Sequence, residues 1–273
     1  MRASDSAQTR AASTYNASAD SYDDPSNTFW NRFGRRTVER LNLKAGERVL
    51  DVCCGSGASA LPAADRVGPT GSILGLDLSE RLLVLARAKA HAKGLANIEF
   101  RVADAAELDF ESEFDAVVCV FGIFFLPDMP VAVRSLWRAV RPGGQLAVTT
   151  WGPRFFEPAS TVFWNSIREV EPRLYKGFNP WDRITAPEDL LSLLREGGVD
   201  GARAEAESGW HAVPTPEAWW AAVMGSGYRG TIEQLADPAR ERVRDLNQAF
   251  IRDAGVGAVE ANVVYAVARK PAS

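Results

Sequence analysis

Residues 51 to 57, DVCCGSG, combine an acid and two adjacent cysteines, which have reactive side chains, with two glycines. A zinc site needs four ligands at short recurring spacings, and the chain has no C-x-x-C and only two histidines, His91 and His211. Adjacent cysteines also form a strained disulfide. We therefore expect neither a redox centre here nor a bound metal.

The sequence around the two glycines predicts a ligand-binding turn. ERVLDV, residues 47 to 52, is a short apolar run typical of a buried strand, and residues 58 to 68 predict a helix that ends at Gly68. Gly55 and Gly57 between them would expose backbone N–H groups and a helix N-terminus to a ligand. A plain strand-to-helix connection is the alternative explanation of the same pattern.

Strands and helices keep alternating after this turn. We predict strands that end at Asp77, at Asp104 and near Phe121, then a helix over 128–140 and a strand over 141–151. Such alternation predicts a parallel sheet covered on both faces, whose ligands bind at the carboxyl ends of its strands. Asp77 can accept both hydroxyls of a ribose and Asp104 an exocyclic amine, although a single Asp here more often caps the next helix.

Together these motifs resemble those of the class I S-adenosylmethionine-dependent methyltransferases, particularly the branch with the ubiquinone and menaquinone biosynthesis enzymes. The resemblance covers roughly residues 45 to 151, through VLDVCCGSG, LGLDLS, VADAAEL and VCVFGIFFLPD. It implies S-adenosylmethionine as cofactor, closed over by a Tyr-rich N-terminal segment. The residues it assigns to the cofactor are Asp51, Cys53, Gly55, Gly57, Asp77, Leu78, Asp104, Ala105, Cys119, Val120, Phe121, Tyr15 and Tyr22.

The resemblance also implies an α/β, Rossmann-like fold: a mostly parallel seven-stranded sheet in the order 3-2-1-4-5-7-6, its last strand antiparallel. We expect one domain over 1–273, with a helical cap over 1–44, the cofactor-binding core over 45–151, and insertions at 152–184 and 214–258. We interpret the aromatic-rich insertions as a lid over the acceptor pocket, with lid packing or a dimer contact as the alternative. The candidate pocket residues are Phe124, Trp151, Phe156, Tyr175, Trp181 and Trp219.

Two departures from the family pattern carry expectations of their own. Cys53 replaces a glycine, so its backbone must adopt a conformation that L-residues tolerate. FGIFFLPD lacks the polar residues often found there. Its phenylalanines predict either an apolar wall beside the methyl group or core packing, and we expect mainly packing for Phe124 and Phe125. The closing strands are expected over 201–213 and 261–270. The candidates for an arginine that binds the cofactor carboxylate are Arg32, Arg35 and Arg36.

The implied reaction transfers the sulfonium methyl group to a small, aromatic or apolar acceptor by in-line displacement, which depends mainly on alignment and exclusion of water. His211 is the candidate base, with a structural role as the alternative. An NAD(P)-dependent oxidoreductase is a second hypothesis, although the G-x-G-x-x-G positions read Cys53, Gly55 and Ala58, a poor match. A non-catalytic cofactor-binding protein is a third.

The overall charge indicates which partners to expect. A net charge of -4 without a concentrated run of Lys or Arg predicts binding neither to nucleic acid nor to an anionic membrane. No apolar run reaches the roughly 18 residues that a membrane span needs. We therefore expect a cytoplasmic enzyme, monomeric or homodimeric, that acts on a small-molecule acceptor.

Overall fold

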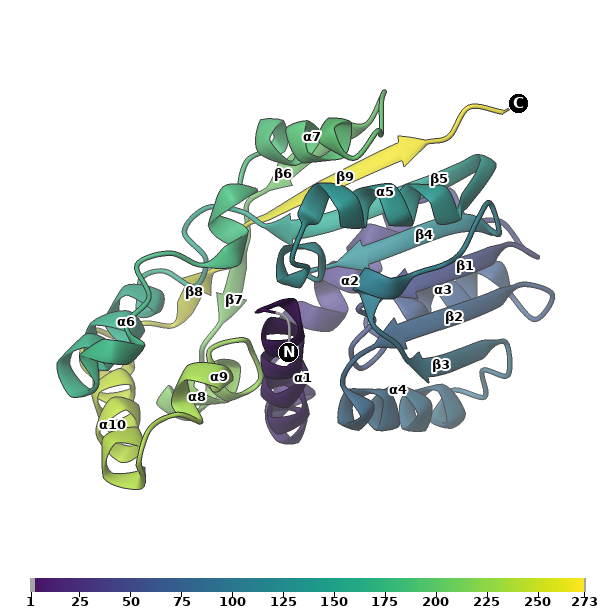
Figure 1. The fold of residues 1–273 in the computed structure, drawn as a ribbon. Helices are drawn as coiled ribbons and strands as arrows, with labels where there is room; N and C mark the ends of the chain where they lie inside the picture. Colours follow the sequence, from purple (N-terminus) through teal and green to yellow (C-terminus); the bar gives the residue numbers. More distant parts are fainter. Residues whose placement is uncertain (1–2, 273) are drawn as a thin grey trace.

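The computed structural model describes residues 3–272, and a seven-stranded sheet in the order β3-β2-β1-β4-β5-β9-β6 organises them (Figure 1). Neighbouring strands from β3 to β5 are parallel, whereas β9 runs antiparallel to both β5 and β6. Numbered within the sheet, this is the predicted order 3-2-1-4-5-7-6 with its last strand antiparallel. The strands are β1 (Arg48–Val52), β2 (Ser72–Asp77), β3 (Ile98–Val102), β4 (Phe114–Val120), β5 (Val140–Trp151), β6 (Arg203–Glu207) and β9 (Val263–Arg269).

Helices cover both faces of the sheet, because successive residues of a buried strand point to opposite sides. On β4, Ala116 and Val118 belong to the apolar cluster under α2, α3 and α4. Val117 and Cys119 belong to the cluster on the other face, with α5 and α7. These helices are α2 (Phe29–Arg40), α3 (Ala60–Val67), α4 (Glu80–Ala92), α5 (Met129–Ala139) and α7 (Pro187–Glu196).

The predicted end of α3 at Gly68 and the predicted start of α5 at Asp128 are confirmed. Gly68, at the end of α3, has φ +66°, a conformation that glycine adopts without strain. The Ser79 hydroxyl accepts a hydrogen bond from the Leu82 amide at 3.2 Å and caps α4. Asp128 caps α5 in the same way. The third strand ends at Val102 rather than at Asp104, because Asp104 caps the short helix η1 (Ala105–Glu107).

The prediction of one continuous strand over 201–213 is wrong, because the strand is interrupted at Gly209. Residues beyond the break form β7 (Trp210–Ala212), which pairs with β8 (Ala258–Glu260) in a separate two-stranded sheet. Asn262 stabilises the break, because its side-chain oxygen accepts a hydrogen bond from the Gly209 amide at 3.1 Å. β6 and β9 therefore remain in the main sheet while their extensions leave it together.

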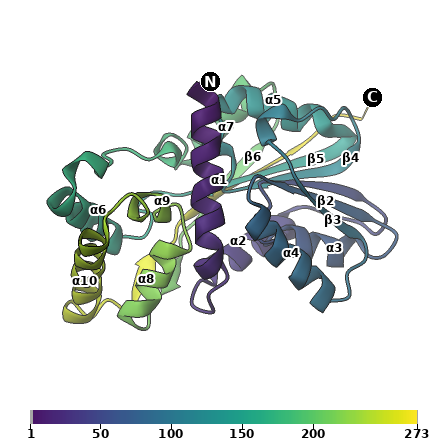
Figure 2. The same cartoon turned by 60° about the horizontal axis from the view of Figure 1, so that its bottom comes forward.

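The two insertions form a helical subdomain beside the β7–β8 sheet, on the left of Figure 1. The first helix, α1 (Ala3–Tyr22), stands between this subdomain and the core (Figure 2). None of the helices in the described part of the chain is long and apolar enough to cross a membrane. The insertion helices are α6 (Ala159–Val170), η3 (Pro172–Leu174), η4 (Pro180–Arg183), α8 (Pro216–Met224), α9 (Arg229–Ile232) and α10 (Asp237–Asp253).

Candidate cofactor and active site

The loop between β1 and α3 contains three residues in the left-handed region: Cys53 at φ +60°, Gly55 at +52° and Gly57 at +87°. Glycine adopts this region freely, whereas it costs an ordinary residue about 1 kcal/mol. A Cβ on Gly55 would stand 3.0 Å from the Tyr22 hydroxyl, and one on Gly122 would stand 2.5 Å from the Cys53 Cβ. The loop is therefore tight, and Cys53 occupies space that Gly122 leaves open.

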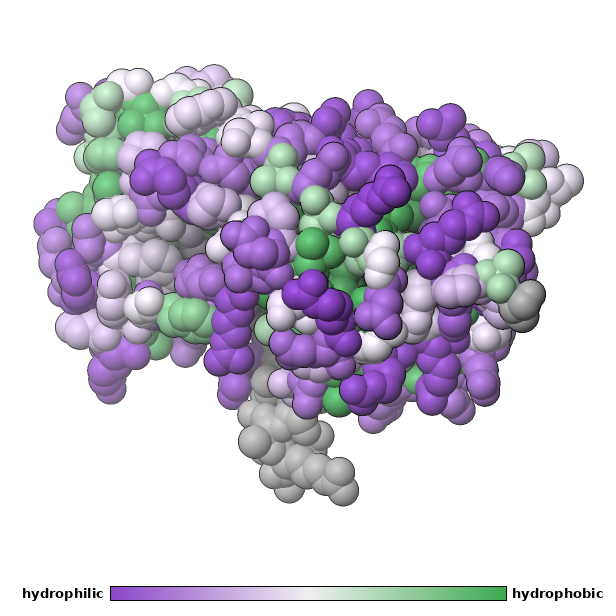
Figure 3. Space-filling model, turned by 90° about the horizontal axis from the view of Figure 1, so that it is seen from above, coloured by the Kyte–Doolittle hydropathy of each residue, from purple (hydrophilic) through white to green (hydrophobic). Residues whose placement is uncertain are grey.

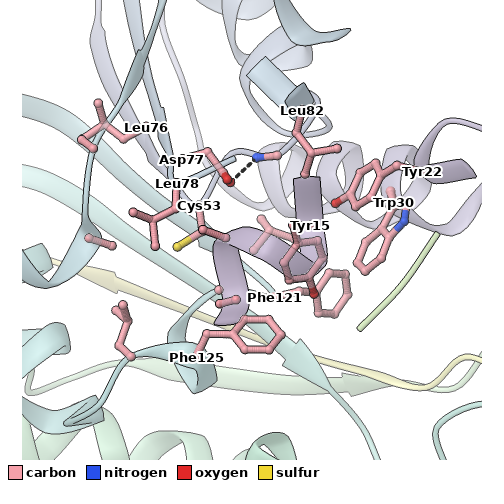
Figure 4. Close-up of a pocket in the computed structure, with 18 residues that line it drawn as sticks. Tyr15, Tyr22, Trp30, Cys53, Leu76, Asp77, Leu78, Leu82, Phe121 and Phe125 are labelled. Carbon is pink, nitrogen blue, oxygen red and sulfur yellow. Dashed lines mark hydrogen bonds between the residues drawn. The ribbon is translucent and has the colours of Figure 1, made fainter. Parts of the chain in front are cut away.

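Asp77 ties this loop to the end of β2. One of its carboxylate oxygens accepts a hydrogen bond from the Gly55 amide at 2.8 Å (Figure 4), and the other accepts from the Ser79 amide at 2.8 Å. Burial raises the pKa of Asp77, and the backbone hydrogen bonds oppose that rise. Asp77 lines the cavity, and a carboxylate has more acceptor sites than the two amides occupy, so it can also accept from a ligand hydroxyl.

Two tyrosines from α1 cover the cavity. Tyr22 stacks on Trp30, with ring centroids 4.9 Å apart, and Tyr15 packs edge-on against Phe125 at 5.5 Å (Figure 4). Burial and the nearby Asp77 raise the pKa of Tyr15, and burial with Tyr15 and Asp77 raises that of Tyr22. Both hydroxyls consequently remain protonated and can donate hydrogen bonds to a ligand.

The core holds α1 by polar contacts around the cavity mouth. The side-chain oxygen of Asn16 accepts hydrogen bonds from the Ser79 hydroxyl at 2.9 Å and the Arg81 amide at 3.1 Å. Asp23, just beyond α1, accepts a hydrogen bond from Lys89 at 3.0 Å. Ser79 therefore links α1 to Asp77, because its hydroxyl bonds to Asn16 and its amide bonds to the Asp77 carboxylate.

The insertion subdomain holds the opposite face of α1 and the turn that follows it. The Ser18 hydroxyl donates to the Ser226 carbonyl at 3.3 Å, and the Asn27 amide group donates to the Ala221 carbonyl at 3.0 Å. A Cβ on Gly230 would stand 2.4 Å from the Thr14 hydroxyl, so α9 approaches α1 closely. The insertions therefore contact the helix that covers the cavity.

The cavity has two unlike halves. The carboxylate half consists of Gly55, Asp77, Leu78, Ala103 and Ala105, at the ends of β1, β2 and β3. The aromatic half, on the β4 side, has no charged side chain and is closed by aromatic rings. It consists of Trp30, Phe121, Phe125 and Leu126.

Phe121 anchors the aromatic half. It follows β4 with φ +54°, and its ring stacks on Trp151 with centroids 3.9 Å apart and planes 13° from parallel. Trp151 packs in turn against Phe155 at 4.1 Å. This stack gives the cavity a flat, rigid apolar wall.

Nine of the thirteen predicted cofactor residues line the cavity. Three of the others lie behind it: Gly57 faces Leu61 and Ala86, and Cys119 is buried, as is Asp51. The Asp104 carboxylate caps η1 through the Ala106 amide at 2.8 Å and does not line the cavity. The nine lining residues are Tyr15, Tyr22, Cys53, Gly55, Asp77, Leu78, Ala105, Val120 and Phe121.

Asp51 supports the loop from beneath. Its carboxylate accepts a hydrogen bond from the Ser59 hydroxyl at 2.6 Å, next to the start of α3. Burial raises the pKa of Asp51 to about 7, although the Ser59 hydrogen bond opposes that rise. This acid therefore stabilises the glycine loop and does not contact the cavity.

None of the six predicted acceptor-pocket residues lines this cavity. Trp151, Phe156 and Trp219 are buried in the core. Phe124 and Trp181 pack against each other at 5.6 Å, and Tyr175 is 39% exposed on the insertion. No described residue of either insertion lines the cavity, and Tyr175 and Trp181 line a separate hollow within the insertions.

His211, the predicted base, also lies away from the cavity. It is buried on β7 with its ring 4.8 Å from that of Phe29, and its Nε2 atom has no hydrogen-bond partner. Burial, with Arg32 nearby, lowers the pKa of His211 to about 4. The imidazole is therefore neutral at pH 7, and its place in the structure matches the structural alternative.

The three candidate arginines do not reach the cavity either. Arg36 pairs with Glu207 at 2.6 Å, and Arg32 donates to the Trp210 carbonyl at 2.8 Å. Arg35 lines an outer hollow beside Gly57. A cofactor carboxylate would therefore meet the tyrosine hydroxyls and backbone amides rather than one of these guanidinium groups.

Several residues that line the cavity were not predicted from the sequence. Phe125 was expected to pack in the core, but it lines the cavity, whereas its neighbour Phe124 faces away. Trp30 is adjacent to the buried Phe29 on the same helix and gives no periodic signal of its own. The other missed residues are Ala11, Ala12, Leu76, Leu82, Ala103, Gly122 and Leu126.

The residues present fit an adenosyl cofactor. A carboxylate at the cavity wall suits ribose hydroxyls, Leu78 and Ala105 present apolar surface for a base, and a glycine-rich turn allows close backbone approach. The fold and this site define an S-adenosylmethionine-dependent methyltransferase. Among the described residues, no group of three potential ligands is placed to bind a metal.

Comparison with known proteins identifies the family. The ubiE/COQ5 methyltransferase family matches residues 7–176, and the chain belongs to that family. It is 37% identical over 191 residues to the demethylmenaquinone methyltransferase of Listeria monocytogenes serotype 4b, covering 65% of this chain and 80% of the relative. The corresponding Geobacillus kaustophilus enzyme is 36% identical over 121 residues, covering 44% and 52%.

Solved structures agree with this fold. YcgJ of Bacillus subtilis has a TM-score of 0.58 at 16% identity, over 89% of this chain and all of its own (100%). A Haemonchus contortus phosphoethanolamine N-methyltransferase in complex with S-adenosylhomocysteine has a TM-score of 0.53 at 20% identity, over 88% of this chain and 52% of its own. The comparisons give no support to the oxidoreductase hypothesis.

Proposed function

We propose that this enzyme methylates the ring of a reduced quinone, or a closely similar apolar aromatic ring. The supporting observation is the division of one cavity into a carboxylate half and an aromatic half. The names of the curated relatives, demethylmenaquinone methyltransferases, point to the same class of acceptor.

In this proposal the carboxylate half holds the cofactor. Asp77 accepts from the ribose hydroxyls, while Leu78 and Ala105 pack on the adenine. The neutral hydroxyls of Tyr15 and Tyr22 donate to the carboxylate of the methionine moiety, a role that Arg32, Arg35 and Arg36 are placed too far away to fill. When bound, S-adenosylmethionine supplies an electrophilic methyl group on a positively charged sulfur.

The aromatic half holds the acceptor. Phe121 and Phe125 flank a planar ring, and the rigid stack of Phe121 on Trp151 fixes its orientation. The α1 helix excludes water while its tyrosines are in place. A reduced quinone carries an acidic phenolic hydroxyl that activates its own ring. The ring carbon would bond to the methyl group as the S–CH3 bond breaks, S-adenosylhomocysteine would leave, and the displaced ring hydrogen would pass to solvent as a proton, so the enzyme contributes mainly alignment and desolvation.

Transfer of a labelled methyl group tests this function. The enzyme is incubated anaerobically with methyl-labelled S-adenosylmethionine and a reduced naphthoquinone that lacks the ring methyl, and the organic extract is analysed. We expect label in the quinone product, and a strong loss of label with Asp77→Ala but not with Asp245→Ala, a surface acid on α10. Binding of cofactor without label in any quinol would refute the proposed acceptor.

A further inference from the structure

The separate hollow within the insertions lies between α6, the segment from η3 to η4, and the start of α9. Its volume of about 310 Å³ is within the range of roughly 300 to 1,000 Å³ that is usual for small-molecule sites. Figure 3 shows polar and apolar side chains intermixed over the insertion subdomain, on the left of that view. The aromatic residues of this insertion hollow are Phe155, Trp164, Tyr175, Trp181 and Tyr228.

A stack of three rings separates the insertion hollow from the cofactor cavity. Phe121 lines the cavity and Phe155 lines the hollow, and none of the described residues lines both. Trp151 lies between them, with its ring centroid 3.9 Å from that of Phe121 and 4.1 Å from that of Phe155. A ligand in the hollow is therefore distinct from the cofactor and from an acceptor in the aromatic half.

Three buried polar groups meet at one wall of the insertion hollow. The Ser160 and Tyr228 hydroxyls share a hydrogen bond at 2.9 Å, and whichever of them accepts keeps its own proton to donate. Burial raises the pKa of Tyr228, and both the Ser160 hydroxyl and the Trp164 N–H oppose that rise, which places the three groups together. All three side chains are at most 8% exposed, yet the Trp164 N–H has no hydrogen-bond partner among the described residues. A buried donor without an acceptor is rare in proteins, and here it points to a ligand.

Lys176 adds a positive charge to the same wall. Its ammonium group lies 5.8 Å from the centre of the Trp164 ring. Burial, followed by the positive charge of Arg10, lowers the pKa of Lys176, and no acid among the described residues offsets these effects. The other charged groups that line the hollow are already bound to neighbours: the Arg154 guanidinium to Glu260, the Glu157 carboxylate to Thr161, and the Asp182 carboxylate to the Asn179 amide.

We propose that the insertion hollow binds a small aromatic carboxylate. The carboxylate accepts hydrogen bonds from the Trp164 N–H and from the free proton of the Ser160–Tyr228 pair. Its negative charge pairs with Lys176. The inference goes beyond the proposed function, because it holds whichever acceptor is methylated.

The walls of the hollow select this class of ligand. The rings of Phe155 and Trp181 suit a flat aromatic group, which packs on them by face or edge. Two acids, Glu157 and Asp182, also line the hollow and would repel a doubly charged phosphate more strongly than a singly charged carboxylate.

Calorimetric titration of the full chain with benzoate tests this site, with benzamide as a neutral probe of the same shape. We expect one benzoate per chain, bound about tenfold more tightly than benzamide, because the amide keeps the ring and an acceptor oxygen but lacks the charge that pairs with Lys176. Saturation with S-adenosylhomocysteine should leave the affinity for benzoate unchanged, since the cofactor cavity lies beyond the stack of three rings.

Two variants locate the bound benzoate. Lys176→Gln removes a charge from an exposed side chain, and Trp164→Phe removes the indole donor but keeps a ring. Each should weaken benzoate binding about tenfold, and circular dichroism checks that each is folded. The matched controls are Lys44→Gln, before β1, and Trp210→Phe, on β7, which change exposed residues outside the hollow and should leave the affinity unchanged.

Three results would overturn the inference. The first is failure of the wild type to bind benzoate at millimolar concentration, or equal affinities for benzoate and benzamide. The second is competition between benzoate and S-adenosylhomocysteine, which would place benzoate in the cofactor cavity. The third is an unchanged affinity for benzoate in either Lys176→Gln or Trp164→Phe. None of these results depends on methylation, so they are distinguishable from a failure of the proposed function.

Discussion

The two halves of the cavity are built by different physical means. In the carboxylate half, hydrogen bonds at 2.8 Å from the Gly55 and Ser79 amides fix the Asp77 carboxylate. In the aromatic half, Phe121 and Phe125 are fixed by ring packing, which has shape but little directional preference. Directional contacts select one cofactor, whereas an apolar wall selects acceptors by shape. The two halves should therefore respond differently to substitution.

The largest effect on ligand binding should come from Asp77→Ala. Losing a carboxylate that accepts two hydroxyl hydrogen bonds costs roughly 3 kcal/mol, or about 100-fold in affinity for S-adenosylmethionine. Titration calorimetry measures this loss, and circular dichroism checks that the variant is folded. Asp104→Ala should weaken binding much less, because its carboxylate caps η1 in this structure. Equal losses in the two variants would remove the distinction between these two acids.

The next effect is on the pH dependence of stability. It involves two buried groups, Asp51 beneath the glycine loop and His211 beside Phe29. The pKa of Asp51 is raised to about 7, so the folded state keeps a proton that the unfolded state loses above its ordinary pKa of 3.8. Stability therefore falls as pH rises between those values. Asp51→Asn should remove this slope, so that the variant gains roughly 4 kcal/mol on the wild type between pH 4 and pH 8 in urea unfolding.

His211 should show the opposite sign. Its pKa is lowered to about 4 from 6.5, so the unfolded state binds a proton that the folded state rejects between those values. The contribution of His211 to stability is present above pH 6.5 and is lost as pH falls towards 4. His211→Gln should abolish that loss. If both variants changed the pH dependence of stability in the same direction, burial would not explain one of the two pKa shifts.

Phe125→Ala should separate the halves in a smaller effect. Removing this ring exposes the acceptor side, and we expect the acceptor KM to rise about tenfold while cofactor affinity changes less than about twofold. Steady-state kinetics and calorimetry provide the two values. Phe250→Ala on α10 is the control for loss of a partly buried phenylalanine elsewhere. A large loss of cofactor affinity would show that Phe125 belongs to the carboxylate half.

The smallest effect should come from Cys53→Gly. Glycine relieves the left-handed backbone at φ +60°, worth about 1 kcal/mol, but it also gives the unfolded chain more freedom. Cofactor affinity and turnover should stay within about threefold of the wild type. Gly122→Ala should destabilise the protein, because its new Cβ would meet the Cys53 Cβ at 2.5 Å. That destabilisation should be smaller in the Cys53→Gly background, and thermal melts of the four proteins would show it.

The carboxylate half could be predicted far better from sequence than the aromatic half. Gly55, Asp77, Leu78 and Ala105 lie at the ends of strands, where topology alone brings them together. Asp104 does not line the cavity in this structure, and its carboxylate accepts a local hydrogen bond from the Ala106 amide. Such capping was the alternative that the sequence also allowed.

The aromatic half depends on packing that no local pattern encodes. Phe124 and Phe125 are adjacent on η2, and only the tertiary position of that short helix decides which of them faces the cavity. The helices of the insertions lie outside the main sheet. Their aromatics mostly pack with one another, as in the stacked pair of Phe163 and Tyr228 at 4.5 Å, instead of lining the cavity.

Titration calorimetry with S-adenosylmethionine, on the wild type, Asp77→Ala and Phe125→Ala, tests the division of the cavity most directly. We predict one cofactor bound per chain, an affinity about 100-fold weaker for Asp77→Ala, and an affinity for Phe125→Ala within about twofold of the wild type. Similar losses in both variants, or binding of NADH in place of S-adenosylmethionine by the wild type, would contradict it.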